Sequence, residues 1–132
     1  MAMDKNLKAL GFSLIELLVV LALIGILSAI GLPSYRQYQL RAVATEGALS
    51  LLSMSSVQER ARLNGGRYLD QGQLELLVQL PARVREHFQL LVSVADKAQA
   101  YTLELIPKET TSAMEIISLD SRGLRRPASV WP

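Results

Sequence analysis

The strongest pattern in the chain is an apolar run near its start. Between Phe12 and Leu32 the residues are apolar or small, and Glu16 is the one ionisable side chain among them. A helix over residues 12–32 spans roughly 30 Å, the thickness of a bilayer's hydrocarbon core. A carboxylate at that depth is costly, so Glu16 is a functional candidate.

After this run the pattern becomes amphipathic and predicts that the helix continues to Leu63. Pro33 lies inside the pattern and predicts a kink, because proline removes one main-chain hydrogen bond. Apolar and small residues recur every three or four positions and predict a buried stripe: Tyr35, Tyr38, Ala42, Thr45, Ala48, Leu49, Leu52, Ser56, Val57 and Ala61. The sequence Asn64-Gly65-Gly66 predicts the end of the helix.

A connecting segment and an alternating pattern fill the rest of the chain. Within residues 67–86, the short run 73–78 predicts one helical turn, which Pro81 ends. Period-two alternation then predicts three strands with short connections, over residues 88–95, 101–106 and 114–119. The apolar face of such a meander needs the amphipathic half of the helix to cover it. The predicted fold class is α+β, a long N-terminal helix packed on a small antiparallel sheet.

Composition excludes most catalytic chemistry. The net charge is +2, from 14 Lys and Arg against 12 Asp and Glu, and by itself it gives no nucleic-acid prediction. The chain has no cysteine and a single histidine, His87, which we expect to form a polar pair with Glu86 on a strand edge. Neither a metal-ligand set nor a phosphate-binding glycine spacing is present. We therefore expect no enzyme activity, no cofactor and no metal.

The first residues are typical of a cytoplasmic leader. Lys5, Lys8 and the amine at Met1 outweigh Asp4 ahead of the apolar run, and positive charge there holds a leader in the cytoplasm. From these residues alone, two interpretations stay open. Either the apolar run is retained as a membrane anchor, or the chain is cut before it.

The sequence Gly11-Phe12-Ser13-Leu14-Ile15-Glu16-Leu17 resembles the processing motif of type IV pilins and the related pseudopilins. The resemblance implies that a prepilin peptidase removes residues 1–11 by cutting after Gly11, and methylates the new amine of Phe12. It also implies that Glu16 is the family's fifth-position glutamate, which neutralises the Phe12 amine of a neighbouring subunit during assembly. One helical turn separates Phe12 from Glu16, and a carboxylate suits the start of a helix. The alternative is that Glu16 is a snorkelling residue at the membrane interface.

The resemblance also implies an organisation and a location. Residues 12–33 would form the membrane or filament-core half of the helix, residues 34–64 its amphipathic half, and residues 65–132 the loop and sheet of the head. The subunit would wait in the inner membrane with a periplasmic head and then enter a cell-surface pilus. Its partners would be the membrane, major and minor pilin subunits, prepilin peptidase and the inner-membrane assembly machinery.

The C-terminal region resembles small minor pilins in the order of its motifs. These motifs are Tyr101-Thr102-Leu103, Ile117-Ser118-Leu119-Asp120, Gly123 and Trp131. Met114 and Val130 stand where such proteins carry two cysteines. The resemblance therefore implies that an apolar contact, supported by Trp131, replaces a disulfide and forgoes about 2–4 kcal/mol of loop constraint.

Three arginines near the end of the chain form a basic cluster: Arg122, Arg125 and Arg126. They are either a contact for an anionic surface such as DNA or a solvated turn. The resemblance implies a minor structural subunit that joins or primes a type IV pilus, with roles in twitching motility, adhesion or DNA uptake. The alternatives are a pseudopilin of a type II secretion system and a DNA-binding or adhesive minor pilin.

Overall fold

The computed structural model describes residues 11–109 and 114–132. They belong to two compact units, the first ending at Arg36 and the second comprising Gln37–Pro132, which we call the head. Every buried residue of the described part lies in the head, beginning with Val43. The elements are α1 (Leu14–Gly65), α2 (Gln71–Leu77), α3 (Ala82–His87), β1 (Phe88–Ala95), η1 (Asp96–Ala98), β2 (Ala100–Pro107), β3 (Ile117–Asp120) and β4 (Arg125–Arg126).

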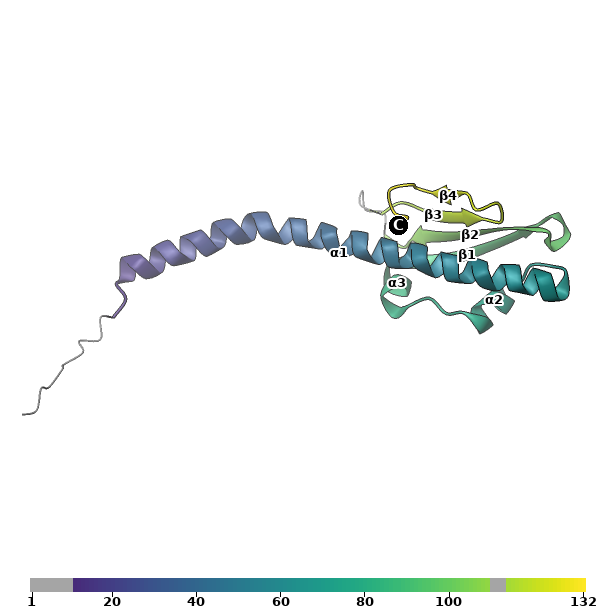
Figure 1. The fold of residues 1–132 in the computed structure, drawn as a ribbon. Helices are drawn as coiled ribbons and strands as arrows, with labels where there is room; N and C mark the ends of the chain where they lie inside the picture. The colour runs from purple at the N-terminus through teal and green to yellow at the C-terminus, as the bar shows by residue number, and fades with distance from the viewer. Residues whose placement is uncertain (1–10, 110–113) are drawn as a thin grey trace, which may run out of the picture. The chain divides into compact units, whose positions relative to one another are not determined.

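In the head, the second half of α1 lies along one face of a four-stranded antiparallel sheet with the order β1-β2-β3-β4 (Figure 1). The first two strands confirm the predicted alternation. Their inward residues are buried: Phe88, Leu90, Val92, Tyr101, Leu103 and Leu105. The predicted α+β class is therefore confirmed.

The sequence predicts three strands, the third over residues 114–119. The last part of the sheet differs from this prediction. β3 begins at Ile117, because its pairing with β2 starts there, opposite Leu105. A fourth strand, β4, follows because Asp120 closes a turn. Its Oδ1 accepts hydrogen bonds from the N–H groups of Arg122 (2.9 Å) and Leu124 (2.8 Å). A strand of two residues is too short to show as alternation in a sequence.

The buried face of α1 is not the predicted stripe. Tyr38 and Leu49, both in that stripe, are 72% and 49% exposed. The buried positions are instead Val43, Ala44, Gly47, Ala48, Leu51, Met54 and Gln58, so Ala48 is common to both sets. A Cβ atom on Gly47 would lie 2.8 Å from Leu105 Cδ1. The sheet approaches α1 closely at Gly47, and the predicted stripe, which was built on other positions of the helix, left this glycine and its buried neighbours out.

Two short helices replace the single turn expected between residues 67 and 86. α2 starts at a capping box, in which Asp70 Oδ1 accepts from the N–H of Gln73 and Gln73 Oε1 accepts from the N–H of Asp70. Pro81 begins α3 as well as ending the preceding segment, since its carbonyl accepts from the N–H of Arg85 (3.0 Å). We expected His87 to form a polar pair with Glu86 on a strand edge. This prediction is wrong, because His87 is the last residue of α3.

A fully buried amide holds the chain after α1 against that helix. Gln58 Nε2 donates to the carbonyl of Leu69 (2.8 Å), and Gln58 Oε1 accepts from the N–H of Leu69 (2.7 Å). The side chain thus pairs with one residue as a neighbouring strand would. It satisfies both main-chain groups of Leu69 at a partly buried position.

We predict that Gln58→Leu destabilises the head by about 2 kcal/mol, because it leaves the N–H and C=O of Leu69 without partners. Urea unfolding followed by circular dichroism measures the change. Gln79→Leu is the matched control, since Gln79 is exposed, and it should change the free energy of unfolding by less than about 0.5 kcal/mol. Equal effects of the two substitutions would contradict this role for Gln58.

Candidate functional site

The predicted processing site precedes the first turn of α1. Gly11 and Phe12 are exposed and lie outside the helix, which begins at Leu14 rather than at Phe12 as the sequence pattern suggests. Ser13 caps the helix, because its Oγ accepts from the N–H of Glu16 (3.2 Å) and its carbonyl accepts from the N–H of Leu17 (3.2 Å).

Glu16 occupies the third position of α1, in its first turn. Carboxylates are favoured there, because the N–H groups of the first turn have no partners within the helix and the helix dipole is positive at that end. The pattern Ser-x-x-Glu is a known signal for a helix start, and Ser13 could have been recognised from it. Sequence reasoning identified Glu16 but missed this capping role of Ser13.

The rest of the first unit offers lipid or other helices an apolar surface. Large apolar side chains from Leu14 to Leu32 are all at least 45% exposed. α1 is long and apolar enough to cross a membrane, with a mean hydropathy of 2.7 in its most apolar window. The helix continues through Pro33. A chain with this surface needs an apolar environment around residues 12–32.

A second candidate site lies at the end of the head where α1 finishes. Three connections meet there: the chain after α1, the β1–β2 turn and the β3–β4 turn. The N–H of Tyr68 donates to the carbonyl of Ala98 (2.9 Å), Gln99 Nε2 donates to that of Gly66 (2.8 Å), and the N–H of Ser121 donates to that of Tyr101 (3.0 Å).

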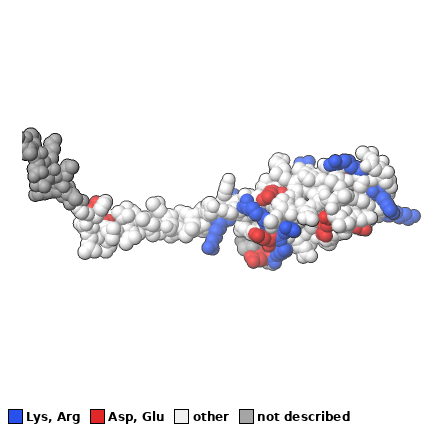
Figure 2. Space-filling view, turned by 90° about the horizontal axis from the view of Figure 1, so that it is seen from below, with Lys and Arg blue, Asp and Glu red and all other residues white. Residues whose placement is uncertain are grey.

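Exposed basic residues project from these connections and from the last turns of α1 (Figure 2). We call them the distal surface: Arg60, Arg62, Arg67, Lys97 and Arg122. Lys97 and Ala98 hold φ angles of 56° and 67°, which residues other than glycine rarely adopt. The interloop hydrogen bonds hold this turn in place.

Beneath the distal surface, two tyrosines join α1 to the sheet. Their rings meet edge to face with centroids 4.6 Å apart, and Tyr101 OH is 2.9 Å from Ser55 Oγ. Tyr68 OH donates to Glu59 Oε1 (3.0 Å) and accepts from Arg62 Nη1 (2.9 Å). Burial raises the pKa of Tyr101, the hydrogen bond from Ser55 lowers it, and negative charge, chiefly that of Glu59, raises it.

The three arginines of the predicted cluster lie in different surroundings. Arg122 lies in the β3–β4 turn and belongs to the distal surface, whereas the Arg125 guanidinium lies over the Trp131 ring, 5.5 Å from its centroid. Arg126 is exposed and pairs with Ser118 in the sheet. Sequence reasoning missed Lys97 and the arginines at the end of α1, because only the fold brings them to the same end of the head as Arg122.

The C-terminal residues pack as apolar groups, as the absence of cysteine suggests. Met114 is buried, and Val130 and Trp131 are partly buried against the same core. The indole Nε1 of Trp131 is buried and forms no hydrogen bond with residues 11–109 or 114–132. That Trp131 compensates for a disulfide stays a prediction.

The fold and the N-terminal site together define the class of the protein, a type IV pilin. Residues 6–32 match the prokaryotic N-terminal methylation motif. Residues 33–115 match the family described as "Type IV minor pilin ComP, DNA uptake sequence receptor". The chain belongs to this minor pilin family, which confirms the resemblance read from the motif around Gly11 and Phe12.

Individual relatives match a shorter stretch. The type IV major pilin protein PilE1 of Neisseria gonorrhoeae is 41% identical over 58 residues, which cover 44% of this chain and 35% of the relative. A fimbrial protein of Pseudomonas aeruginosa is 42% identical over 55 residues, which cover 42% of this chain and 36% of the relative. The match thus spans about a third of the length of these curated relatives. No solved structure matches the chain significantly.

We predict that the head loses stability as the pH rises above about 10, in part through Tyr101. Its pKa is raised in the folded state above the ordinary tyrosine value of about 10. The proton is therefore held more tightly when the chain is folded. The resulting stabilisation is complete below the unfolded pKa and is lost as the pH rises through the folded pKa.

Urea unfolding of wild type and Tyr101→Phe at several pH values between about 8 and 11 measures this effect. The free energy of unfolding should fall less between about pH 8 and about pH 11 in Tyr101→Phe than in wild type. Tyr38→Phe, a change at an exposed tyrosine, should retain the wild-type dependence. Parallel curves for wild type and Tyr101→Phe would show that Tyr101 does not couple to folding.

Proposed function

We propose that the chain is a minor pilin that prepilin peptidase cuts between Gly11 and Phe12 and methylates at Phe12. The inner membrane then holds the subunit through residues 12–32. During assembly, the Glu16 carboxylate pairs with the Phe12 amine of a neighbouring subunit. The inner-membrane assembly machinery and the other pilin subunits are the partners that this role requires.

The observation that carries this proposal is the placement of Glu16. It lies in the first turn of a helix whose residues up to Leu32 are otherwise without charge, four residues after the expected new amine. In lipid such a carboxylate has no cation from its own apolar segment beyond that amine. A neighbour's amine in the filament neutralises it, so pairing favours transfer of the subunit out of the membrane.

The family match favours a pilus over a type II secretion system, since its description names a minor pilin. The same description names a DNA uptake sequence receptor. The distal surface supports DNA binding as a second function, because its five basic residues lie at one end of the head and are exposed. Phosphate contacts of this kind supply affinity without reading sequence.

We predict that Glu16→Gln, which keeps the shape but removes the charge, leaves cleavage and methylation intact. The amount of the subunit in sheared filaments should fall roughly tenfold or more, since the neighbour's amine loses its counter-charge. Mass spectrometry of the N-terminus measures processing, and quantitative immunoblotting of filaments measures incorporation.

Glu16→Asp is the control, because it retains a carboxylate, and it should be incorporated better than Glu16→Gln. Wild-type incorporation of Glu16→Gln would refute the docking role. A failure of cleavage in the same variant would instead place Glu16 in recognition by the peptidase.

We predict that the double substitution Arg67→Gln and Arg122→Gln weakens binding of duplex DNA to the full chain in detergent micelles. Each lost phosphate contact should reduce the slope of log K against log salt by about 0.9. Filter binding at several salt concentrations measures the affinity for DNA and its salt dependence.

Arg83→Gln is the matched control, since Arg83 lies on α3, outside the distal surface. It should leave affinity and salt slope near those of wild type. If the double variant keeps the wild-type slope, the distal surface does not contact DNA phosphates.

A further inference from the structure

The two edges of the sheet differ in how they are protected. β4 has two residues, both arginine, and is followed by Pro127, which has no N–H group. Charge, shortness and proline are common means of blocking an edge strand. β1 has eight residues and none of these protections. The sheet therefore has one blocked edge and one open edge.

The side chain of Gln71 covers only part of the β1 edge. Its Nε2 donates to the carbonyl of Leu90 and its Oε1 accepts from the N–H of Val92, both at 3.3 Å. Since the main-chain groups of alternate residues point to the same side of an antiparallel strand, those of Phe88 and Leu90 face away from β2. Among the described residues, the carbonyl of Phe88 and the N–H of Leu90 form no hydrogen bond.

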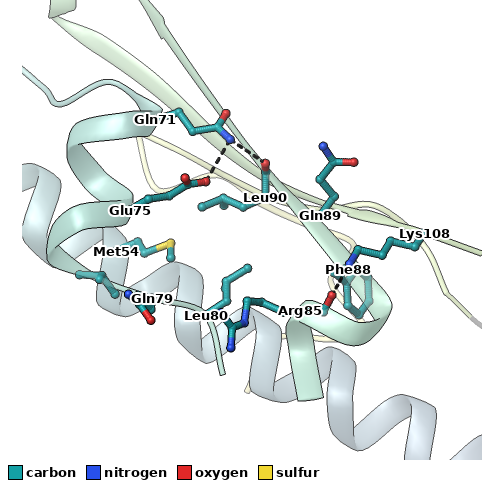
Figure 3. Close-up of a pocket in the computed structure, with 11 residues that line it drawn as sticks. Met54, Gln71, Glu75, Gln79, Leu80, Arg85, Phe88, Gln89, Leu90 and Lys108 are labelled. Atoms are coloured by element: carbon teal, nitrogen blue, oxygen red, sulfur yellow. Dashed lines mark hydrogen bonds between the residues drawn. The ribbon is translucent and has the colours of Figure 1, made fainter. Parts of the chain in front are cut away.

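A pocket of about 440 Å³ opens beside these groups (Figure 3). Its inner wall includes Met54 from α1, Leu80 and Phe88, all of which are buried. A pocket of this size with an apolar wall is large enough to receive a side chain of a ligand.

The opposite wall of the pocket is formed by the segment between α2 and α3. Residues 78–81 begin and end in extended conformations, with φ −138° and ψ 123° at Val78, and φ −54° and ψ 146° at Pro81. In the described part of the chain, no hydrogen bond joins this segment to β1, and the main-chain groups of Gln79 and Leu80 have no partner. The pocket is thus a slot with free main-chain groups on both walls, which we call the β1 groove.

Three charged side chains line the β1 groove, Glu75, Arg85 and Lys108, and their net charge is +1. Glu75 accepts a hydrogen bond from Gln71 Nε2 (3.0 Å), and Lys108 Nζ donates to the carbonyl of Arg85, which holds the ammonium against α3. The Arg85 guanidinium extends beside Leu80 at the rim of the pocket (Figure 3), and the Arg85 side chain is exposed. It can receive a carboxylate from outside.

We propose that the β1 groove binds an extended peptide segment of a partner protein as an added strand. The peptide donates an N–H to the carbonyl of Phe88 and accepts from the N–H of Leu90. One of its apolar side chains enters the pocket over Met54, and an acidic side chain pairs with Arg85. Strand addition of this kind draws affinity from main-chain hydrogen bonds and specificity from the pocket.

A peptide fits this groove better than a nucleic acid does. The β1 wall offers an acceptor at the carbonyl of Phe88 and a donor at the N–H of Leu90, and the floor includes the apolar side chains of Met54, Leu80 and Phe88. A phosphate backbone would need several available cations along its path, whereas of the two cations at this rim one is held by a carbonyl of α3.

Selection from a phage-displayed library of random heptapeptides on the full chain in detergent micelles tests the proposal. We expect enriched sequences that alternate apolar residues with polar ones and carry Asp or Glu at one end. Fluorescence anisotropy with a synthetic enriched peptide should then show that Arg85→Glu weakens binding roughly tenfold or more. Arg83→Glu, on the same helix but outside the groove, should bind as wild type does.

Hydrogen exchange provides a readout that separates strand addition from simple charge attraction. The bound peptide should slow exchange of the Leu90 amide, which faces the groove, and should leave that of Ser93, which faces β2, unchanged. Failure to enrich any sequence, equal binding to Arg85→Glu, or binding without protection of Leu90 would each overturn the proposal. Binding of a short DNA duplex that Arg85→Glu abolishes and Arg83→Glu preserves would overturn it as well.

Discussion

The carboxylate of Glu16 is the constraint on which the N-terminal half of the chain depends. Its neighbours up to Leu32 are apolar and exposed, so this segment is stable only in lipid or among other helices. Either environment leaves a charge unsatisfied unless a cation is supplied. In the proposed assembly, a neighbouring N-terminal amine would supply that cation without adding any charged residue to the apolar surface. Glu16 would then favour the filament over the membrane.

The head combines one core with two surfaces that we propose for contacts with other molecules. Its core is closed by the second half of α1, where Gly47 allows a close approach to β2, and by the amide of Gln58. The distal surface and the β1 groove lie at different edges of this core and use different chemistry, cations in the first and strand pairing in the second.

Features set by residues close together in the sequence could be predicted. Features that form only when distant segments meet in the fold could not. The apolar segment, Glu16, and the inward residues of β1 and β2 follow from local spacing. The buried face of α1 does not, because Gly47 and Gln58 are buried for reasons of close approach and hydrogen bonding rather than hydrophobicity. The distal surface escaped prediction because Arg67, Lys97 and Arg122 come together only when three turns meet.

The most direct test of the central claim is a cryo-electron-microscopy structure of filaments that contain this subunit. The account predicts that the Glu16 carboxylate lies within about 4 Å of the Phe12 amine of a neighbouring subunit, the distance of an ion pair. A map in which the carboxylate faces away from every N-terminal amine would contradict it.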